Sequence, residues 1–235
     1  MGDDVARIGE ALLLGACDLT GSMGADEDVA VERTLRSASR TVGAVVRGAG
    51  HVGVALTARG DLDVRATGDP VADELDAIQA SLGEGPAVEA AARGETVDVP
   101  DLAADPRWPR FADAAAGHGV TSTLSLALRA HDGVLGVLTI YSPAALDPHG
   151  RAVAGALAAQ VTVALYGARR IAGLARAVGS RDVIGQAKGI LIQRDGVDDE
   201  GAFTMLVQAS QATNLKLVDV AHWLVAQARG TGAPD

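Results

Sequence analysis

The sequence predicts an α+β fold, in which an antiparallel sheet with flanking helices is followed by a long connecting helix and an all-α three-helix bundle. Three observations support this prediction. Helical and strand patterns, including two hairpins, alternate between residues 29 and 147. A helical pattern with no internal proline then extends from Pro148 to Val178. Three shorter helical patterns follow, up to residue 230.

The length and the charge distribution predict two domains. A chain of 235 residues, 48% hydrophobic, is long enough for one medium and one small domain. Residues 1–168 carry 12 arginines and 23 carboxylates, whereas residues 169–230 carry eight basic and six acidic side chains. A contact with a polyanion is therefore expected in the C-terminal part. We divide the chain into an N-terminal tail or short helix (1–28), a first domain (29–168), a second domain (169–230) and a tail (231–235).

The first domain opens with a helix and a hairpin. Apolar residues recur at helical spacing from Val29 to Gly48, where closely spaced glycines end the helix. The apolar run 51–57 is a predicted strand, Arg59-Gly60-Asp61 is its turn, and the alternating run 62–67 is the second arm. This arrangement predicts a helix packed beside the first two strands.

The rest of the first domain alternates between helix and strand. Proline suits the first turn of a helix, and alternation of polar and apolar residues suits a strand. The remaining elements are a helix over 70–82, a helix from Pro86, a strand over 96–100, a helix around Phe111, and a hairpin of strands 123–129 and 134–141.

The second domain begins with an amphipathic helix that carries a basic stripe. Its apolar side consists of Ile184, Ala187 and Leu191. The adjoining stripe consists of Arg181, Gly185 and Lys188. Two cationic side chains flanking a residue without a Cβ let a phosphate backbone approach the helix closely. The pattern alone favours the alternative of an ordinary solvated surface, with Lys188 as a solvated lysine.

Two further helices complete the second domain. Acidic residues at 198–200 suit the start of the second helix, where the helix dipole stabilises negative charge. The predicted inner side of this helix consists of Ala202, Phe203, Leu206, Val207 and Ser210. The segment 212–216 breaks the pattern, and a third helix extends from Leu217 to Gly230.

The second domain resembles the ANTAR domain, a three-helix RNA-binding module of bacterial transcription antitermination regulators, over roughly residues 170–229. The resemblance is carried by the Arg-x-x-Ile-x-x-Ala-Lys-Gly-x-Leu run from Arg181, the Ala202-Phe203 pair, and the Ser-x-x-x-Asn-x-Lys-Leu-x-x-Val-Ala run from Ser210 to Ala221. It implies binding to RNA hairpins in transcript leaders. On this basis we assign phosphate contacts to Arg181, Lys188 and Lys216, and polar contacts to Gln186 and Asn214.

The first domain resembles a GAF domain over roughly residues 29–168. The resemblance is carried by Leu82-Gly83-Glu84-Gly85-Pro86, Val99-Pro100-Asp101-Leu102, Arg107-Trp108-Pro109 and the run 133–142. GAF domains that accompany ANTAR modules in actinobacteria are very similar, but they commonly place Cys directly after Gly-Pro, where this chain has Ala87. That departure removes a candidate redox or ligand-contact thiol.

The GAF resemblance implies a sensor with a small-molecule pocket. The residues that we assign to such a pocket are Asp101, Asp105, Arg107 and Trp108. The same polar residues also suit the capping of turns, and we favour that interpretation. The sequence does not identify a cofactor or a ligand.

The sequence contains no pattern typical of catalysis or of a metal site. Gly83-x-Gly85 lacks the third glycine of a dinucleotide fingerprint, and neither Gly-x-Ser-x-Gly nor a Walker motif occurs. The five histidines are scattered, and the single cysteine, Cys17, excludes an intramolecular disulfide. The first domain has no lysine, which a phospho-receiver domain requires. We therefore expect neither enzyme activity nor a bound metal. We also expect that the protein is not regulated by phosphorylation of an aspartate in this chain.

The sequence favours a regulator in which a GAF-like sensor of a ligand or partner controls an ANTAR-like module that promotes read-through at terminators. Two alternatives remain open. A DNA-binding three-helix transcription regulator fits the helix count equally well. A regulator that uses its GAF-like domain only for docking to another protein needs no small-molecule ligand.

The helix near residues 150–178 predicts a homodimer. Its small and apolar residues recur at helical spacing, so a continuous helix can pair with a second copy as a coiled coil. The alternative is two helices joined by a bend near Gly167. The acidic start, Gly2-Asp3-Asp4, and the absence of an apolar run of membrane-spanning length predict a cytoplasmic protein without membrane contact.

Overall fold

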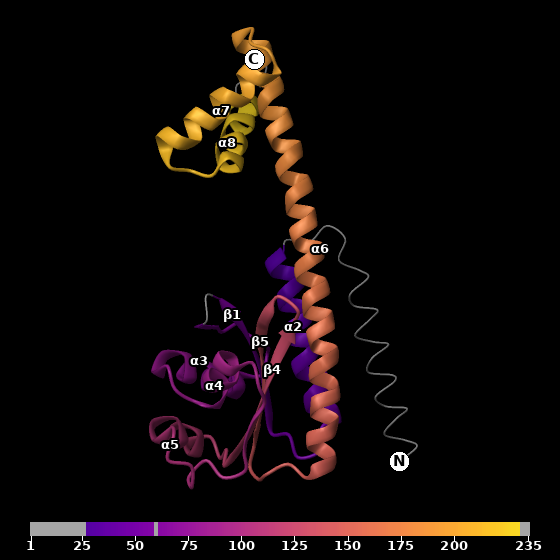
Figure 1. The fold of residues 1–235 in the computed structure, drawn as a ribbon, viewed down its shortest axis with the longest axis vertical. Coiled ribbons are helices and arrows are strands. Elements are labelled where there is room, and N and C mark those ends of the chain that lie inside the picture. Colours follow the sequence, from indigo (N-terminus) through magenta and orange to yellow (C-terminus); the bar gives the residue numbers. More distant parts are fainter. Residues whose placement is uncertain (1–26, 59–60, 231–235) are drawn as a thin grey trace, which may run out of the picture. The chain divides into compact units, whose positions relative to one another are not determined.

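The computed structural model describes residues 27–58 and 61–230 (Figure 1). The chain divides into two compact units, which meet between Arg170 and Ile171. The predicted N-terminal tail or short helix lies outside the described residues, except for Glu27 and Asp28, which begin helix α2. The predicted C-terminal tail also lies outside them.

The described elements follow the predicted order. In the first unit they are α2 (Glu27–Val45), β1 (His51–Ala58), β2 (Asp61–Asp63), α3 (Pro70–Leu82), α4 (Pro86–Arg93), β3 (Val97–Val99), α5 (Pro109–Gly117), β4 (Ser122–Ala130), β5 (Gly133–Ser142) and the first part of α6 (Pro148–Asp195). The second unit contains the rest of α6, α7 (Asp199–Thr213) and α8 (Leu217–Gly230). Helix α6 is assigned without a break at Gly167.

The described strands form one five-stranded sheet in the order β2-β1-β5-β4-β3, and every neighbouring pair is antiparallel. The predicted α+β class is therefore confirmed. Strand β5 pairs along most of its length with both β1 and β4, which makes it the central strand. One register shift, between Leu128 and Arg129, interrupts the β4–β5 pairing near the hairpin turn.

Strand β2 is shorter than the predicted run 62–67. Its pairing with β1 ends at Asp63, opposite Leu56. Beyond that point the chain turns toward α3, because the backbone N–H and the hydroxyl of Thr67 both donate hydrogen bonds to the Asp73 carboxylate, at 2.8 and 2.6 Å. The buried Thr67 thus anchors the approach to a helix and does not extend the sheet.

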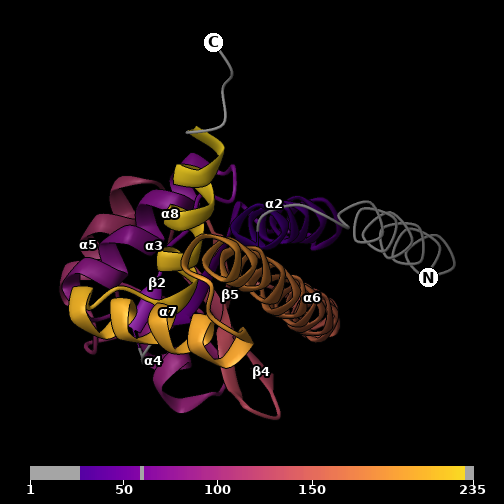
Figure 2. The same ribbon diagram turned by 90° about the horizontal axis from the view of Figure 1, so that it is seen from above.

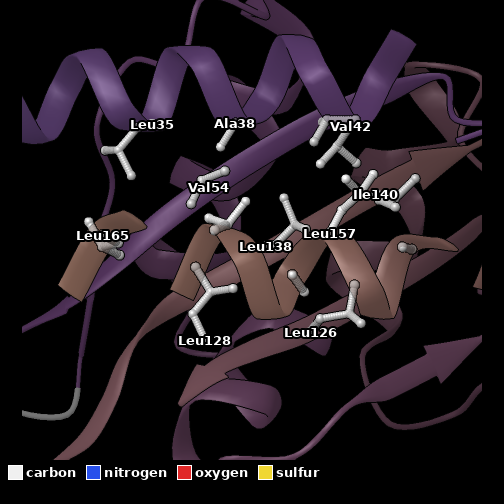
Figure 3. Close-up of a cluster of buried hydrophobic side chains, with 14 of the residues drawn as sticks. Leu35, Ala38, Val42, Val54, Leu126, Leu128, Leu138, Ile140, Leu157 and Leu165 are labelled. Atoms are coloured by element: carbon white, nitrogen blue, oxygen red, sulfur yellow. The ribbon is translucent and has the colours of Figure 1, made fainter. Parts of the chain in front are cut away.

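Helices α2 and α6 cover one face of the sheet, and α3, α4 and α5 cover the other (Figure 1, Figure 2). Side chains alternate between the two faces along each strand. In Figure 3, Leu126 and Leu128 of β4 and Leu138 and Ile140 of β5 therefore lie on the same side as Leu157 and the other core residues of α2 and α6.

One described segment, Pro148–Ile171 of α6, is apolar and long enough to cross a membrane. Part of its apolar surface is buried against the sheet, through residues that include Ala154, Leu157, Val161 and Leu165. Packing one side of a helix onto a sheet requires an apolar stripe. The place of this segment in the core therefore accounts for its buried apolar side.

The second unit is a three-helix bundle with its own core. The buried residues are Val183, Ala187 and Leu191 of α6, Ala202 and Leu206 of α7, and Ala221, Leu224 and Val225 of α8. Ile184 packs against this core as predicted, although it is less buried than Val183. One prediction about this core was wrong, because Phe203 is 43% exposed. Asp198 caps α7 by accepting a hydrogen bond from Gly201 N, and the helix then turns Ala202 inward and Phe203 about 100° away.

Candidate nucleic-acid interface and sensor interior

An open line runs along the solvent-facing side of α6. Gly185 lies two residues from both Val183 and Ala187 of the core, which places it on the opposite side of the helix. Arg181, Gly185 and Gly189 are all exposed and lie four residues apart. A Cβ at either glycine would meet no atom within 4 Å. A polyanion can therefore approach the backbone of α6 beside the Arg181 guanidinium.

Lys188 has an intramolecular partner. Its Nζ atom lies 2.5 Å from Oδ1 of Asp199, and its side chain is only 21% exposed. The prediction of a solvated lysine was therefore wrong. The turn after α6 contains Gly196, whose φ of 67° lies in the left-handed region, and it brings the acidic first turn of α7 beside α6. Asp199 thereby neutralises the lysine while remaining largely exposed itself.

The remaining predicted RNA contacts come from α6 and from the turn between α7 and α8. Gln186 is exposed on α6. Asn214 ends α7 with a φ of 54°, a conformation that asparagine tolerates better than most residues. The carbonyl of Lys216 accepts the first backbone hydrogen bonds of α8, and its side chain is exposed. Asn214 therefore has a structural role in the turn as well as an exposed side chain.

The four residues assigned to a sensor pocket lie close together in the sequence before α5, and their polar groups are bound within the protein, including Arg107 to Glu89 of α4 at 3.0 Å. Asp101 accepts hydrogen bonds from Ala103 N and Ala104 N. Asp105 accepts bonds from the backbone and guanidinium of Arg107, which lower the pKa of its carboxyl. The guanidinium also lies 4.1 Å from the ring centre of the buried Trp108. The structure thus shows the turn-capping role for these aspartates.

A buried polar network in the first unit was not predicted from the sequence. Tyr141 Oη donates a hydrogen bond to Oδ1 of Asp76, Gln79 Nε2 donates to Tyr141 Oη at 2.7 Å, and Ala87 N donates to Gln79 Oε1 at 2.8 Å. All three side chains are buried between the sheet and the helices α3 and α4. A Cβ at Gly53 of β1 would overlap the Asp76 carboxylate. A signal was present, because Asp76 and Gln79 lie at helical spacing with the apolar Ala72 of α3.

Burial dominates the ionisation of this network. It raises the pKa of Asp76 to about 7, although the hydrogen bond from Tyr141 acts in the opposite direction. Burial also raises the pKa of Tyr141 well above its ordinary value, and the nearby Asp76 adds to that effect. Asp76 is therefore a carboxyl group that folding holds largely in its neutral form below pH 7.

One hydroxyl group beside this network has no hydrogen-bond partner among the described residues. Thr123 of β4 pairs in register with Tyr141, and its Oγ1 atom is buried. Its neighbours Ser125 and Thr139, in contrast, share a hydrogen bond at 3.2 Å. Within the part of the chain that the structure describes, no group of three or more His, Cys, Asp and Glu side chains is arranged to hold a metal ion.

The family model of the GAF domain matches residues 26–165, which is more than half of the chain. The chain belongs to the GAF domain family. A second family model, that of the ANTAR domain, matches residues 172–225. The chain thus combines a sensory GAF domain with an ANTAR domain of the RNA-binding antitermination type. Both predicted resemblances are confirmed, and the actinobacterial type remains a prediction.

Solved structures resemble this chain at low sequence identity. A bacteriophytochrome from R. palustris is 13% identical with a TM-score of 0.50, over 88% of this chain and 46% of its own. The GAF domain of an Acinetobacter phosphoenolpyruvate-protein phosphotransferase is 13% identical with a TM-score of 0.48, and the match covers 72% of this chain and 96% of that domain. A free methionine-R-sulfoxide reductase from Neisseria meningitidis is 22% identical with a TM-score of 0.44, and the match covers 61% of this chain and 86% of the reductase. Such identities describe the fold alone, and no curated protein matches the chain.

Proposed function

We propose that this chain is a cytoplasmic antitermination regulator without enzyme activity, whose ANTAR domain binds hairpins in transcript leaders. Its GAF domain controls that binding in response to a ligand or a protein partner. The observation that carries the proposal is the open line of Arg181, Gly185 and Gly189 on α6. A helix side without Cβ atoms beside an exposed arginine suits close contact with a phosphate backbone.

Lys188 takes part in this interface by exchanging its partner. In the free protein its ammonium group is paired with the exposed carboxylate of Asp199, in the first turn of α7. A phosphate oxygen offers the same ammonium group an equivalent ionic hydrogen bond. We therefore place Lys188 beside Arg181 as a phosphate contact that forms when RNA displaces Asp199.

Thr123 is a candidate ligand contact in the sensor interior; among the described residues, Glu84 and Ser142 also have a buried polar atom without a hydrogen-bond partner. The Thr123 hydroxyl lies beside Tyr141 on the sheet face that α3, α4 and α5 cover, and it makes no hydrogen bond within the described residues. A buried hydroxyl without a partner costs free energy that a bound polar group recovers. We propose Thr123, rather than Asp101 or Asp105, as the contact for a small polar ligand.

The Arg181→Ala variant is expected to weaken binding to a transcript-leader hairpin. The loss of one phosphate contact should lower the slope of log affinity against log salt by roughly 1. Affinities are measured by fluorescence anisotropy over a series of salt concentrations. The control is Arg194→Ala, because Arg194 is exposed on α6 but is bound to the adjacent Asp195 at 2.9 Å and lies away from the open line.

The same measurement with duplex DNA of matching sequence separates the two nucleic acids. Tighter binding of the wild-type protein to the duplex would support a DNA-binding regulator and overturn the RNA proposal. If Arg181→Ala and Arg194→Ala lost RNA affinity and salt slope to the same extent, the salt dependence would reflect net charge and not a contact at the open line.

The Leu174→Glu variant is expected to convert a homodimer into a monomer. Ile171, Leu174 and Val178 are all exposed on α6 at spacings of three and four residues, the arrangement of a coiled-coil seam. A carboxylate at the middle position would be buried and unpaired in the dimer. Light scattering should give about twice the chain mass of 23.7 kDa for the wild type and the chain mass for the variant.

The control for the seam is Gln193→Glu, which adds the same charge to an exposed position of α6 outside these three residues. It should leave the dimer intact. A wild-type protein that is monomeric at micromolar concentration would exclude this seam as a stable interface.

A further inference from the structure

Trp223 of α8 presents an aromatic ring to solvent on the ANTAR domain. Its side chain is 63% exposed, whereas the other tryptophan of the chain, Trp108, is buried. Trp223 lies two residues from both Ala221 and Val225, which belong to the bundle core. The helical phase therefore holds the indole on the side of α8 that faces away from that core.

The surroundings of Trp223 on α8 are polar. Asp219 and Gln227 lie four residues before and after it, and Lys216 lies seven residues before it. The four-residue spacings place Asp219 and Gln227 beside the ring on the same side of the helix, and Lys216 lies about two turns away, just before the helix begins. A large contiguous apolar patch often marks an interface with another protein, whereas the residues four positions before and after Trp223 on α8 are polar. A single exposed aromatic ring among polar side chains is instead suited to stacking on a flat, polar-edged partner.

A nucleobase has the required chemistry. Its faces stack on aromatic rings while its edges and backbone remain hydrated or bind polar groups, and RNA loops supply unpaired bases. Lys216 is exposed at the start of α8, two turns from the indole along one side. Its ammonium group can hold a phosphate of the same loop while the ring holds a base.

We infer that Trp223 is a base-stacking residue of this ANTAR domain, which binds an unpaired base from the loop of an RNA hairpin. This inference rests on the proposed RNA-binding function, and it adds a contact outside the basic stripe of α6. It also gives the interface a part that is independent of salt, because stacking neutralises no phosphate.

The test uses the full-length chain and a pool of RNA hairpins with randomised loops, from which the hairpin bound most tightly by the wild type is taken as the probe. Trp223→Ala and Trp223→Leu should each weaken binding about ten-fold, since stacking one base on an aromatic ring contributes on that order. Trp223→Phe should retain part of the affinity, and the salt slope should not change. The control is His222→Ala, which removes an exposed ring from a neighbouring side of α8.

The outcomes separate this inference from the function on which it rests. Wild-type protein that binds no hairpin of the pool would overturn both. If Trp223→Ala bound the hairpin as tightly as the wild type, base stacking alone would be overturned. The same would follow if Trp223→Leu and Trp223→Phe bound it with equal affinity. Unchanged RNA affinity together with a change of oligomeric state in Trp223→Ala would assign the residue to a protein interface. Circular dichroism confirms that the variants remain folded, which the exposure of the side chain leads us to expect.

Discussion

Replacing Asp76 by asparagine is expected to remove most of the pH dependence of GAF-domain stability between pH 4 and 7. Folding raises the pKa of this carboxyl from 3.8 to about 7. The folded state therefore binds a proton that the unfolded state releases in this range. The stability contributed by the protonated group is fully present below about pH 4, and it is lost as the pH rises through 7.

The size of the effect follows from the pKa difference. Each pKa unit corresponds to about 1.4 kcal/mol, so wild-type stability should fall by about 4 kcal/mol across this range. Asparagine resembles the neutral carboxyl and can still accept the hydrogen bond from Tyr141. Its stability at pH 8 should therefore equal or exceed that of the wild type.

Urea denaturation at pH 4 and pH 8 measures this difference. Trp108 lies in the GAF-domain core, so its fluorescence in a Trp223→Phe background reports on that domain and not on the ANTAR domain. The control is Asp113→Asn, which neutralises an exposed carboxylate on α5 and should follow the wild type. If Asp76→Asn and the wild type lost stability in parallel, Asp76 would not be the titrating group.

The Gly136→Ala substitution is expected to destabilise the GAF domain by about 3 kcal/mol. Gly136 lies on the central strand β5, opposite Leu56 of β1. A Cβ there would overlap the carbonyl oxygen of Ala55 and lie 3.2 Å from Leu56 Cα. These are backbone atoms, so relief requires the two strands to separate, which weakens their hydrogen bonds.

The matched control is Gly155→Ala on α6, where a Cβ would meet no atom within 4 Å. Alanine favours a helix by roughly 0.8–1.0 kcal/mol over glycine, so this variant should be slightly more stable than the wild type. Both are measured from urea unfolding followed by Trp108 fluorescence. Equal stabilities for the two variants would show that β1 and β5 accommodate a methyl group.

The order of the elements could be predicted because proline and glycine mark their ends. Helices α3, α4, α5 and α6 each begin at a proline, which fixes a suitable φ angle and needs no hydrogen-bond donor there. Glycines with positive φ at 83 and 94 end the first two of these helices. Such signals are local, and the sequence therefore contains them directly.

The candidate sites were less predictable because their contacts join distant residues or depend on helical phase. Tyr141 reaches Asp76 across 65 positions of the chain, and no local pattern connects them. Phe203 was placed on the inner side of α7, but its cap sets a phase in which Ala202 and Leu206 face inward. Lys188 looked solvated because Asp199 belongs to the next helix.

The pairing of Lys188 with Asp199 would also give the proposed interface a means of discriminating between anions. A single small anion that displaced the carboxylate would gain only what Asp199 already provides, so chloride or free phosphate has little advantage at this lysine. Under the proposed function, an RNA hairpin held at Arg181 would bring its next phosphate at a high effective concentration, and that proximity would favour the exchange. On this proposal the internal carboxylate is a competitor that only a multivalent ligand overcomes.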